Sequence, residues 1–410
     1  MAFAPDVPVV LAAIHEEAIL PFLFMHALDR PLNMQPFKRK VFYLGGFDPR
    51  GARFYHELLA QQVAAHNADV AEEAHLELGP RRRLGANSAW SLESAAGDVS
   101  GEHEFLMWDD LVRKHWLSNP WSLFRHACVA YAHFVARLDR ALMPAVPRGS
   151  LVALYYPGAT FVLLPLVLAL LGWLGLRVFV ADWLSLVVAA AFGVGVAWLL
   201  LRKIHSLWLL RFVIFNDQLA RRAVDPAVWD RIEAFAQRLN AALDEGWDEV
   251  LFISHSNGTV MAMPVMARLL ALREGQIPAH FAQVTLGGCV QLLAGRRDAA
   301  WFAGVLDEIG QGGWLWLDLG SPTDGACVPL VDPCLGRPVP RPAGLEQLSP
   351  RWFRYCDGES YAARRSDKYL IHFDYLRRLN RPSPLDYLGL VAVSRPLSAS
   401  IAAFKAENPA

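Results

Sequence analysis

The sequence predicts an α/β fold, in which a mostly parallel sheet is flanked by helices and interrupted by two inserted apolar helices. The sheet is indicated by short apolar runs of strand length that alternate with longer runs of helical periodicity, a pattern typical of parallel strands covered on both faces. The insertion is indicated by two long uncharged runs in the middle of the chain. A chain of 410 residues is long enough to bury one large core and to carry such an insertion.

The composition excludes some classes of function. A net charge of −1 gives no basic surplus for binding nucleic acid. Apolar residues make up 54% of the chain and charged residues 19%, whereas charged residues average about 25% in soluble proteins. The five cysteines have no metal-ligand spacing and no secretory signal precedes them, so we expect a reducing, cytoplasmic setting without metal or cofactor. They are Cys128, Cys289, Cys327, Cys334 and Cys356.

The chain is expected to open with a helical extension, residues 1–38, that is either an amphipathic helix on the membrane or a packed helix. The first part of the α/β domain follows at residues 39–145. It begins with a buried strand, Val41–Gly46, that runs into a glycine-rich loop, and a helix starts near Ala52. Further strands are expected at Ala74–Leu78, Ala89–Ser94 and Glu104–Trp108, and one long or two shorter amphipathic helices at Asp109–Leu142.

Residues 146–203 are expected to form a transmembrane helical hairpin. Leu151–Leu176 contains 26 residues without a charge and Trp183–Leu201 contains 19, and roughly 20 helical residues span a bilayer core. Basic residues flank both outer ends, so by the positive-inside rule both ends face the cytoplasm. This places the protein in the inner membrane, with the α/β domain on the cytoplasmic side. Two alternatives remain open: a pair of core helices in a soluble fold, and a hairpin that dips into the membrane without crossing it.

The second part of the α/β domain is expected at residues 204–395, followed by a C-terminal tail at 396–410. Helices and strands alternate up to residue 319, and the segment from Ser321 onward is rich in proline and arginine and is expected to be mostly loop. The expected helices are Ile204–Phe215, Pro226–Leu243, Thr259–Arg273 and Ala299–Ile309, and the expected strands are one beginning at Val250, Phe281–Leu286 and Trp314–Leu319.

A candidate nucleophile lies where one of these strands turns into a helix. Val250–Met261 reads VLFISHSNGTVM, an apolar run followed by small residues around Ser256. A sharp strand-to-helix turn lifts a serine hydroxyl above the sheet edge and points the first free N–H groups of the helix at the group that the serine attacks. The usual motif is G-x-S-x-G, and Ser254 stands in place of its first glycine, which weakens the match.

The base should follow the nucleophile in the sequence, because a serine hydroxyl needs an imidazole to take its proton and a carboxylate to orient that imidazole. Only His280 and His372 lie after Ser256. His280 precedes a strand, which is the wrong end of the sheet for catalysis. His372 follows the last expected strand after a long loop, so we expect His372 to be the base.

The acid should lie between these two residues, beyond the carboxyl end of a later strand. That strand is Trp314–Leu319, and Asp324 lies in the loop that leaves it. Pro-Thr-Asp-Gly is also ordinary turn chemistry, but the position of Asp324 between Ser256 and His372 favours a catalytic role. The second choices are Asp318, on the strand, and Asp332, in a later turn.

An acyl oxyanion needs two preorganised N–H donors. The backbone of Asn257, directly after the candidate nucleophile, should supply one. The other should come from the loop after an early strand, where Gly45 and Gly46 let the backbone approach a substrate closely, with Phe47 as the first choice of donor and Gly46 as the second. Charged residues in the same loop either form a structural ion pair or leave an arginine to bind an anionic headgroup: Asp48, Arg50 and Arg53.

With Ser256, Asp324 and His372 in this order behind a glycine-rich loop, the chain resembles the α/β-hydrolase superfamily, in particular a membrane-associated bacterial branch. The resemblance covers roughly residues 39–110 and 204–379 and leaves out the hairpin. It implies hydrolysis of an acyl ester, thioester or amide, or acyl transfer, through an acyl-serine intermediate without metal or cofactor. It does not imply a substrate.

We therefore expect a membrane-anchored serine hydrolase of esterase or lipase type, whose partners are the lipid bilayer and an acyl-ester or lipid-like substrate. Two alternatives stay open. One is a non-catalytic module of this fold that binds a lipid or a protein. The other is an acyltransferase that uses the same three side chains but excludes water. The sequence also leaves open the acyl chain, the headgroup, the oligomeric state and whether the helices around the hairpin form a lid.

Overall fold

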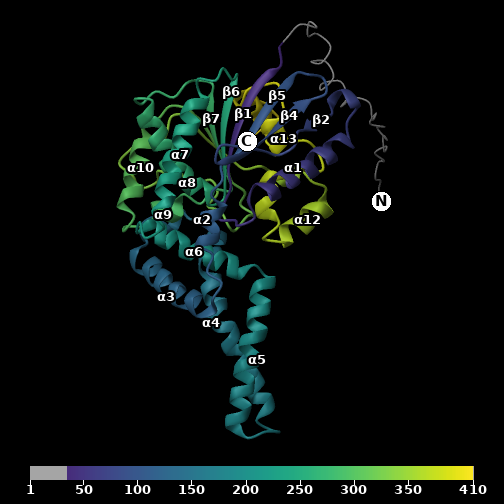
Figure 1. The fold of residues 1–410 in the computed structure, drawn as a ribbon. Coiled ribbons are helices and arrows are strands. Elements are labelled where there is room, and N and C mark those ends of the chain that lie inside the picture. Colours follow the sequence, from purple (N-terminus) through teal and green to yellow (C-terminus); the bar gives the residue numbers. More distant parts are fainter. Residues whose placement is uncertain (1–34, 410) are drawn as a thin grey trace, which may run out of the picture. The chain divides into compact units, whose positions relative to one another are not determined.

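A mixed sheet of nine strands organises residues 35–409, which are the part of the chain that the computed structural model describes (Figure 1). The strands are β1 (Phe37–Leu44), β2 (Leu76–Leu78), β3 (Arg82–Leu84), β4 (Asn87–Ser94), β5 (Val99–Phe105), β6 (Glu249–His255), β7 (Phe281–Leu286), β8 (Leu315–Leu319) and β9 (Leu345–Leu348). Neighbours follow the order β2-β4-β5-β1-β6-β7-β8-β9, with β3 paired to β4. The pairs from β5 to β9 are parallel, and those among β2 to β5 are antiparallel.

Helices flank this sheet and carry its crossover connections, so the expected α/β architecture with a mostly parallel sheet and two apolar helices is confirmed. The helices of the first half are α1 (Gly51–Asn67), α2 (Asp109–Lys114), α3 (Pro120–Arg137), α4 (Arg148–Leu176) and α5 (Asp182–Lys203). Those that follow are α6 (Ser206–Ala220), α7 (Ala227–Ala242), α8 (Gly258–Leu272), α9 (Gln291–Ala294), α10 (Ala300–Gly310), α11 (Trp352–Tyr355), α12 (Gly358–Ser366), α13 (Tyr387–Val391) and α14 (Leu397–Glu407).

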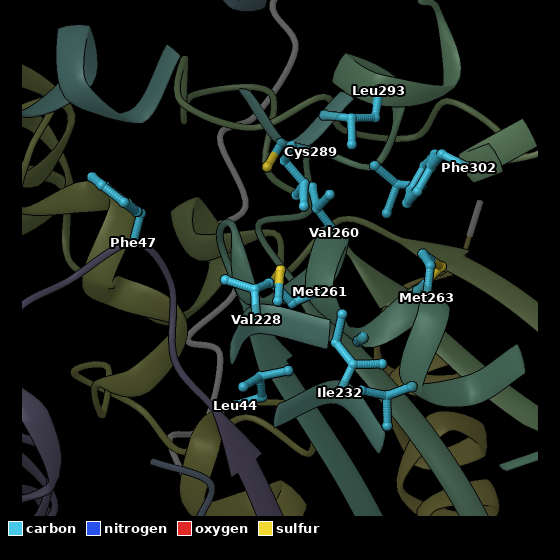
Figure 2. Packing of buried hydrophobic residues seen from close by; sticks show 14 of the residues in the cluster. Leu44, Phe47, Val228, Ile232, Val260, Met261, Met263, Cys289, Leu293 and Phe302 are labelled. Carbon is cyan, nitrogen blue, oxygen red and sulfur yellow. The ribbon is translucent and has the colours of Figure 1, made fainter. Parts of the chain in front are cut away.

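Strand β1 separates two hydrophobic cores, because successive side chains of a strand point to opposite faces of the sheet. Phe42 and Leu44 join a core that includes α7 and α8, whereas Val41 and Tyr43 join a core that includes α1 and α13. Central strands that are buried on both faces in this way are typical of parallel sheets. Figure 2 shows part of the first core, in which Leu44 and Phe47 share the interior with Val228 and Ile232 of α7 and with Val260 and Met261 of α8.

Helices α4 and α5 are the two apolar helices of the expected hairpin, and they pack along each other. At Gly193 of α5 the two backbones are so close that an added Cβ would lie 2.6 Å from the backbone nitrogen of Ala169 in α4. Away from this contact large apolar side chains are exposed, for example Leu171 at 60% and Phe192 at 64%. By length and composition both helices are sufficient to cross a membrane.

The structure corrects several expected element boundaries. The strand expected at Glu104–Trp108 is β5, which runs from Val99 to Phe105, and β3 is absent from the expected elements. The segment Asp109–Leu142 contains two helices, α2 and α3, which is the second of the two expected alternatives. The segment from Ser321 onward is mostly loop, as expected, but it also contains the short strand β9 and helices α11 to α14, which the sequence did not predict.

The expected N-terminal extension lies outside the described residues, apart from residues 35–38. At the other end, helix α14 occupies most of the expected tail and buries Leu397, Ile401 and Phe404. Burial against the rest of the protein holds such short helices in place, because a single helix of this length is marginal in water.

Residues in the first half of β1 form buried ion pairs with both neighbouring strands, β6 and β5. Arg39 of β1 donates from Nε to Glu249 of β6 at 2.8 Å, and the ammonium group of Lys40 lies 2.7 Å from a carboxylate oxygen of Glu104 in β5. Glu249 also accepts the N–H of Leu397 at the start of α14, at 2.7 Å. Charges are buried here only because they are paired and hydrogen-bonded. The Arg39–Glu249 pair lies at the end of the strands opposite to the turn between β6 and α8.

Candidate active site

The turn between β6 and α8 holds Ser256 in an uncommon backbone conformation. Its φ angle is 56°, in the left-handed region, where strained non-glycine residues often mark functional turns. The Ser256 N–H donates to the carbonyl of Leu286 at 3.0 Å, and the Ser256 carbonyl accepts the N–H and the hydroxyl of Thr259 at 3.0 and 2.7 Å. These bonds hold the sharp strand-to-helix turn that the sequence predicts.

The loop after β1 packs directly against this turn, because glycines occupy both surfaces. A Cβ added to Gly46 would lie 2.8 Å from the Cβ of Ser256, and one added to Gly258 would lie 2.3 Å from the last carbonyl oxygen of β1. Ser254, in the place of the motif's first glycine, fits within β6, where its hydroxyl donates to the carbonyl of Val284 at 3.4 Å. The backbone of Gly46 therefore lies beside the side chain of Ser256.

Asp324, in the loop after β8, and His372, in the short 3-10 helix Ile371–Leu376, form a buried hydrogen bond. Nδ1 of His372 donates to Oδ2 of Asp324 at 2.8 Å, and the two residues are 0% and 1% exposed. Burial alone would raise the pKa of the Asp324 carboxyl, but the charge and hydrogen bond of His372 hold this pKa below its usual value. A neutral His372 that donates from Nδ1 has a lone pair on Nε2, and within residues 35–409 this Nε2 has no hydrogen-bond partner.

Three contacts bring this pair to the turn of Ser256. The rings of His255 and His372 lie with centroids 4.8 Å apart, and Nε2 of His255 donates to the carbonyl of His372 at 2.8 Å. Leu286 accepts the Ser256 N–H, and the next residue, Gly287, lies against the acid: a Cβ added to Gly287 would lie 3.3 Å from Oδ2 of Asp324. Asp324 and His372 thus lie against the residues that flank Ser256, at the carboxyl end of the parallel strands, but within the described residues no hydrogen bond joins Ser256 to His372.

His255 supports this arrangement rather than acting as a base. Burial, followed by the nearby charge of His372, lowers its pKa to about 3, so it remains neutral near pH 7. Its proton lies on Nε2, because the backbone carbonyl that Nε2 contacts only accepts. This bond holds the backbone of His372 in place.

The second choices for base and acid have other partners than Ser256 and His372. The carbonyl of His280 accepts the N–H of Val250 near the start of β6, at the opposite end of the sheet from Ser256. The Asp318 carboxylate accepts hydrogen bonds from Thr285 at 2.7 Å and Gln347 at 3.0 Å, and burial raises its pKa. Asp332 accepts the N–H of Cys334 within a turn.

The predicted oxyanion donors have backbone N–H groups that are available. Within the described residues, the N–H groups of Asn257, Phe47 and Gly46 donate no hydrogen bond to the protein. The carbonyl of Gly46 accepts the N–H of Asp48 at 2.8 Å, which fixes the turn of the loop. The Phe47 ring is buried and stacks on Phe215 with centroids 4.9 Å apart. The loop is therefore rigid where a substrate oxygen would approach.

The charged residues of the same loop form a structural pair. Nη2 of Arg50 lies 2.6 Å from Oδ2 of Asp48, and the hydroxyl of Tyr55 donates to the same oxygen at 3.0 Å. Arg53 pairs with Glu57 on the surface of α1 at 2.7 Å. The sequence leaves open whether these residues form a structural ion pair or leave an arginine to bind an anionic headgroup, and the structure shows the ion pair.

Two aromatic residues complete the site and were not among its expected members. Nε1 of Trp208 in α6 donates to the carbonyl of Phe47 at 3.0 Å, and its ring lies 5.9 Å from the ring of His372. The ring of Tyr369 packs edge-on against Trp208 at 5.5 Å. Tyr369 lies three residues before His372 in the sequence, and this proximity could have predicted that it belongs to the site. Trp208 is distant in the sequence, and only the tertiary fold brings it to the site.

The site is closed in this structure. Ser256 is 6% exposed and His372 is fully buried, while Trp208 and Tyr369 are half-buried around them. No group of His, Cys, Asp or Glu side chains suited to a metal ion occurs within residues 35–409. No protein-family model, curated protein or solved structure matches the chain.

Proposed function

We propose that the protein is a membrane-anchored serine hydrolase of esterase or lipase type, built on an α/β-hydrolase-like fold. The observation that carries this proposal is the buried Asp324–His372 hydrogen bond beside Ser256, because it leaves the lone pair of His372 Nε2 without a partner. A serine in a strained turn, an imidazole with a free nitrogen and an orienting carboxylate together activate an acyl-transfer nucleophile.

In the proposed reaction Oγ of Ser256 attacks the carbonyl carbon of an acyl ester while Nε2 of His372 takes the hydroxyl proton. The Asp324 carboxylate stabilises the imidazolium, and the N–H groups of Asn257 and Phe47 bind the oxyanion. Each such donor contributes roughly 3 kcal/mol to the transition state. The proton then passes from His372 to the leaving alcohol, which gives an acyl-serine, and water deprotonated by His372 releases the acid. This route requires neither metal nor cofactor.

The hairpin supplies the proposed localisation. Helices α4 and α5 have the length and exposed apolar side chains of membrane-spanning segments, and basic residues flank their outer ends. We place the hairpin in the inner membrane with the hydrolase domain on the cytoplasmic side.

The proposal is tested by labelling the detergent-solubilised protein with a fluorophosphonate, which reacts covalently with activated serines. We expect labelling of the wild type and no labelling of Ser256→Ala or His372→Ala. The matched control is Ser254→Ala, which removes a buried hydroxyl two residues from Ser256 and should still be labelled. An unlabelled wild type that is folded by circular dichroism would favour a non-catalytic binding module, and labelling of Ser256→Ala would identify another nucleophile.

Acyl transfer is the second candidate, because the closed site limits access of water to an acyl-serine. Product analysis distinguishes the two reactions. In the presence of glycerol and a labelled ester, a hydrolase releases the labelled acid, whereas an acyltransferase forms the labelled glycerol ester.

A further inference from the structure

The first hairpin helix begins on the loop that carries Asp324. In the first turn of α4 the hydroxyl of Ser150 donates to the carbonyl of Cys327 at 2.5 Å. A Cβ added to Gly325 would lie 3.4 Å from the carbonyl oxygen of Gly149. The start of α4 and the loop directly after Asp324 are therefore in contact, and we call this contact the first root of the hairpin.

The second hairpin helix ends on the segment that carries His372. His205 lies between α5 and α6 with a φ of 55°, so the chain changes direction there through a strained residue. Its ring stacks on Tyr369 with centroids 3.8 Å apart. Three residues further on, Trp208 contacts both the Phe47 carbonyl and the ring of His372. We call this contact the second root.

The two roots therefore contact the segments that carry the catalytic pair, the first root the loop of Asp324 and the second root the segment of His372 and the loop of Phe47. Trp208 and Tyr369, which surround the closed site, belong to the second root or pack on it. A substrate that reaches Ser256 must displace side chains that are held by the membrane helices. Its route to the site thus begins where the hairpin leaves the protein, at the level of the lipid headgroups.

Exposed cations gather at both roots. Arg148 begins α4, Arg202 and Lys203 end α5, and Lys368 precedes Tyr369. Within the described residues none of these four forms an ion pair. Lys368 donates to the carbonyl of Thr323, next to Asp324, at 3.5 Å. The acid in this region, Asp367, accepts the backbone N–H groups of Tyr369 and Leu370. The roots thus present a surplus of positive charge, which attracts anionic headgroups.

We propose that the substrate is the acyl ester of a membrane lipid with an anionic headgroup, which enters between the two roots while the four cations hold its headgroup. This inference rests on the proposed hydrolase function and names its substrate class. Apolar side chains of the hairpin face the acyl chains of the bilayer, and the cations lie at the level where an anionic headgroup would be. The ester bond of such a lipid lies between these two zones, which is where the roots meet Ser256.

The experiment compares pyrene-labelled phosphatidylglycerol with pyrene-labelled phosphatidylcholine, each as a trace component of neutral detergent micelles, and measures release of the labelled fatty acid. For the wild type we expect kcat/KM to be roughly tenfold or more higher for the anionic lipid, since each cation near the headgroup contributes about fivefold. In Arg202→Gln/Lys203→Gln this preference should fall by at least about fivefold, while turnover of soluble p-nitrophenyl butyrate is unchanged. The control is Arg81→Gln, an exposed cation between β2 and β3, which should keep the wild-type preference.

The outcomes separate this inference from the function on which it rests. A protein that reacts with the fluorophosphonate but cleaves both lipids equally, or prefers the soluble ester, overturns the substrate class alone. A preference for the anionic lipid that is unchanged in the double variant overturns the role of the root cations. Failure of the wild type to react with the fluorophosphonate overturns the hydrolase proposal first.

Discussion

The hydrogen bond between Asp324 and His372 determines which nitrogen of the imidazole is available to Ser256. Donation from Nδ1 leaves the lone pair on Nε2. Because the carboxylate accepts from Nδ1 and from the N–H of Ala326 at 2.9 Å, it is held in one orientation. At the scale of single residues the site therefore depends on a carboxylate that only accepts.

Replacement of Asp324 by asparagine tests this dependence. The amide can donate toward Nδ1 and so favours the wrong tautomer, and we expect the acylation rate to fall by about 10³- to 10⁴-fold. Single-turnover kinetics with a p-nitrophenyl ester measure it. Asp318→Asn, which changes the other buried carboxyl at this sheet edge, should stay within a few fold of wild type, and a loss as large as that of Asp324→Asn would contradict the assignment.

Asp386 gives a prediction about pH. Burial raises its pKa to about 6, while the unfolded value is about 3.9. Below pH 4 the carboxyl is neutral in both states, and as the pH rises through 6 the folded state must hold a buried carboxylate, so stability is lost. This loss amounts to about 3 kcal/mol for a shift of roughly two units.

Asp386→Asn removes that titration. Relative to wild type, the variant should become more stable as the pH rises from 4.5 to 7.5, that is, its free energy of unfolding should increase by comparison, as measured by tryptophan fluorescence in detergent. The side chain accepts the N–H groups of Gly389 and Ser383. Loss of one acceptor oxygen is expected to lower the free energy of unfolding of the variant by the same amount at every pH. A difference that does not change with pH would show that this carboxyl does not titrate in the range.

At the scale of elements, the contact between β1 and α8 depends on the absence of a side chain. Gly258→Ala would place a methyl group 2.3 Å from the carbonyl oxygen of Leu44, and we expect destabilisation of about 1–3 kcal/mol together with slower acylation. Gly304→Ala in α10 is the matched control, because nothing lies within 4 Å of the added Cβ. It should be neutral or stabilising by up to about 1 kcal/mol. Equal effects of the two variants on thermal unfolding would contradict the proposed close contact.

The hairpin offers a second matched pair. Gly193→Val inserts a branched side chain where the added Cβ would lie 2.6 Å from the backbone of α4, whereas Gly195→Val, two residues away, meets nothing within 4 Å. We expect only Gly193→Val to lower the unfolding temperature of the detergent-solubilised protein, because it forces α4 and α5 apart. A similar loss in Gly195→Val would point to a contact on the other face of α5.

Elements with a strong local period are predictable from the sequence, and the errors have physical causes. The strand Phe281–Leu286 has the same bounds in the structure because its burial is continuous. Strand β5 is displaced in the prediction because Glu102, His103 and Glu104 interrupt its apolar pattern. The latter two are buried, and Lys40 pairs with both glutamates. A charge that is buried with a partner distant in sequence leaves no local signal.

The same distinction applies to the candidate site. The turn at Ser256, the order of the acid and the histidine, and the glycine-rich loop are all local features, and the structure places them together. The contacts of Trp208 and His205 with the site join segments more than 150 residues apart, for example Trp208 and Phe47 at a separation of 161. Such contacts arise from the fold and have no motif.

At the scale of the whole molecule, the proposed topology places the α/β domain and the turn between α4 and α5 on opposite sides of the membrane. Cys128 on α3 is the exposed cysteine among the five, and it serves as a native reporter of the domain side. Phe179, in the turn, is 84% exposed. A membrane-impermeant maleimide added to intact cells should label Phe179→Cys, in a Cys128→Ser background, and should label wild-type Cys128 only after lysis. The reverse pattern, or equal labelling, would contradict the topology.

The position of the hairpin within the chain also has a consequence for synthesis. Strands β1 and β6 are hydrogen-bonded neighbours, yet the whole hairpin lies between them in the sequence. At ordinary rates of translation β6 is synthesised about 10–40 s after β1. During this time the edge of β1 that will pair with β6 is unpaired, and an unpaired strand edge favours aggregation. If the hairpin inserts as it emerges, the nascent chain is already tethered to the bilayer when β6 leaves the ribosome. The strands on the two sides of the hairpin are then both held near the membrane while they pair. The hairpin that anchors the finished protein thus also assists its folding.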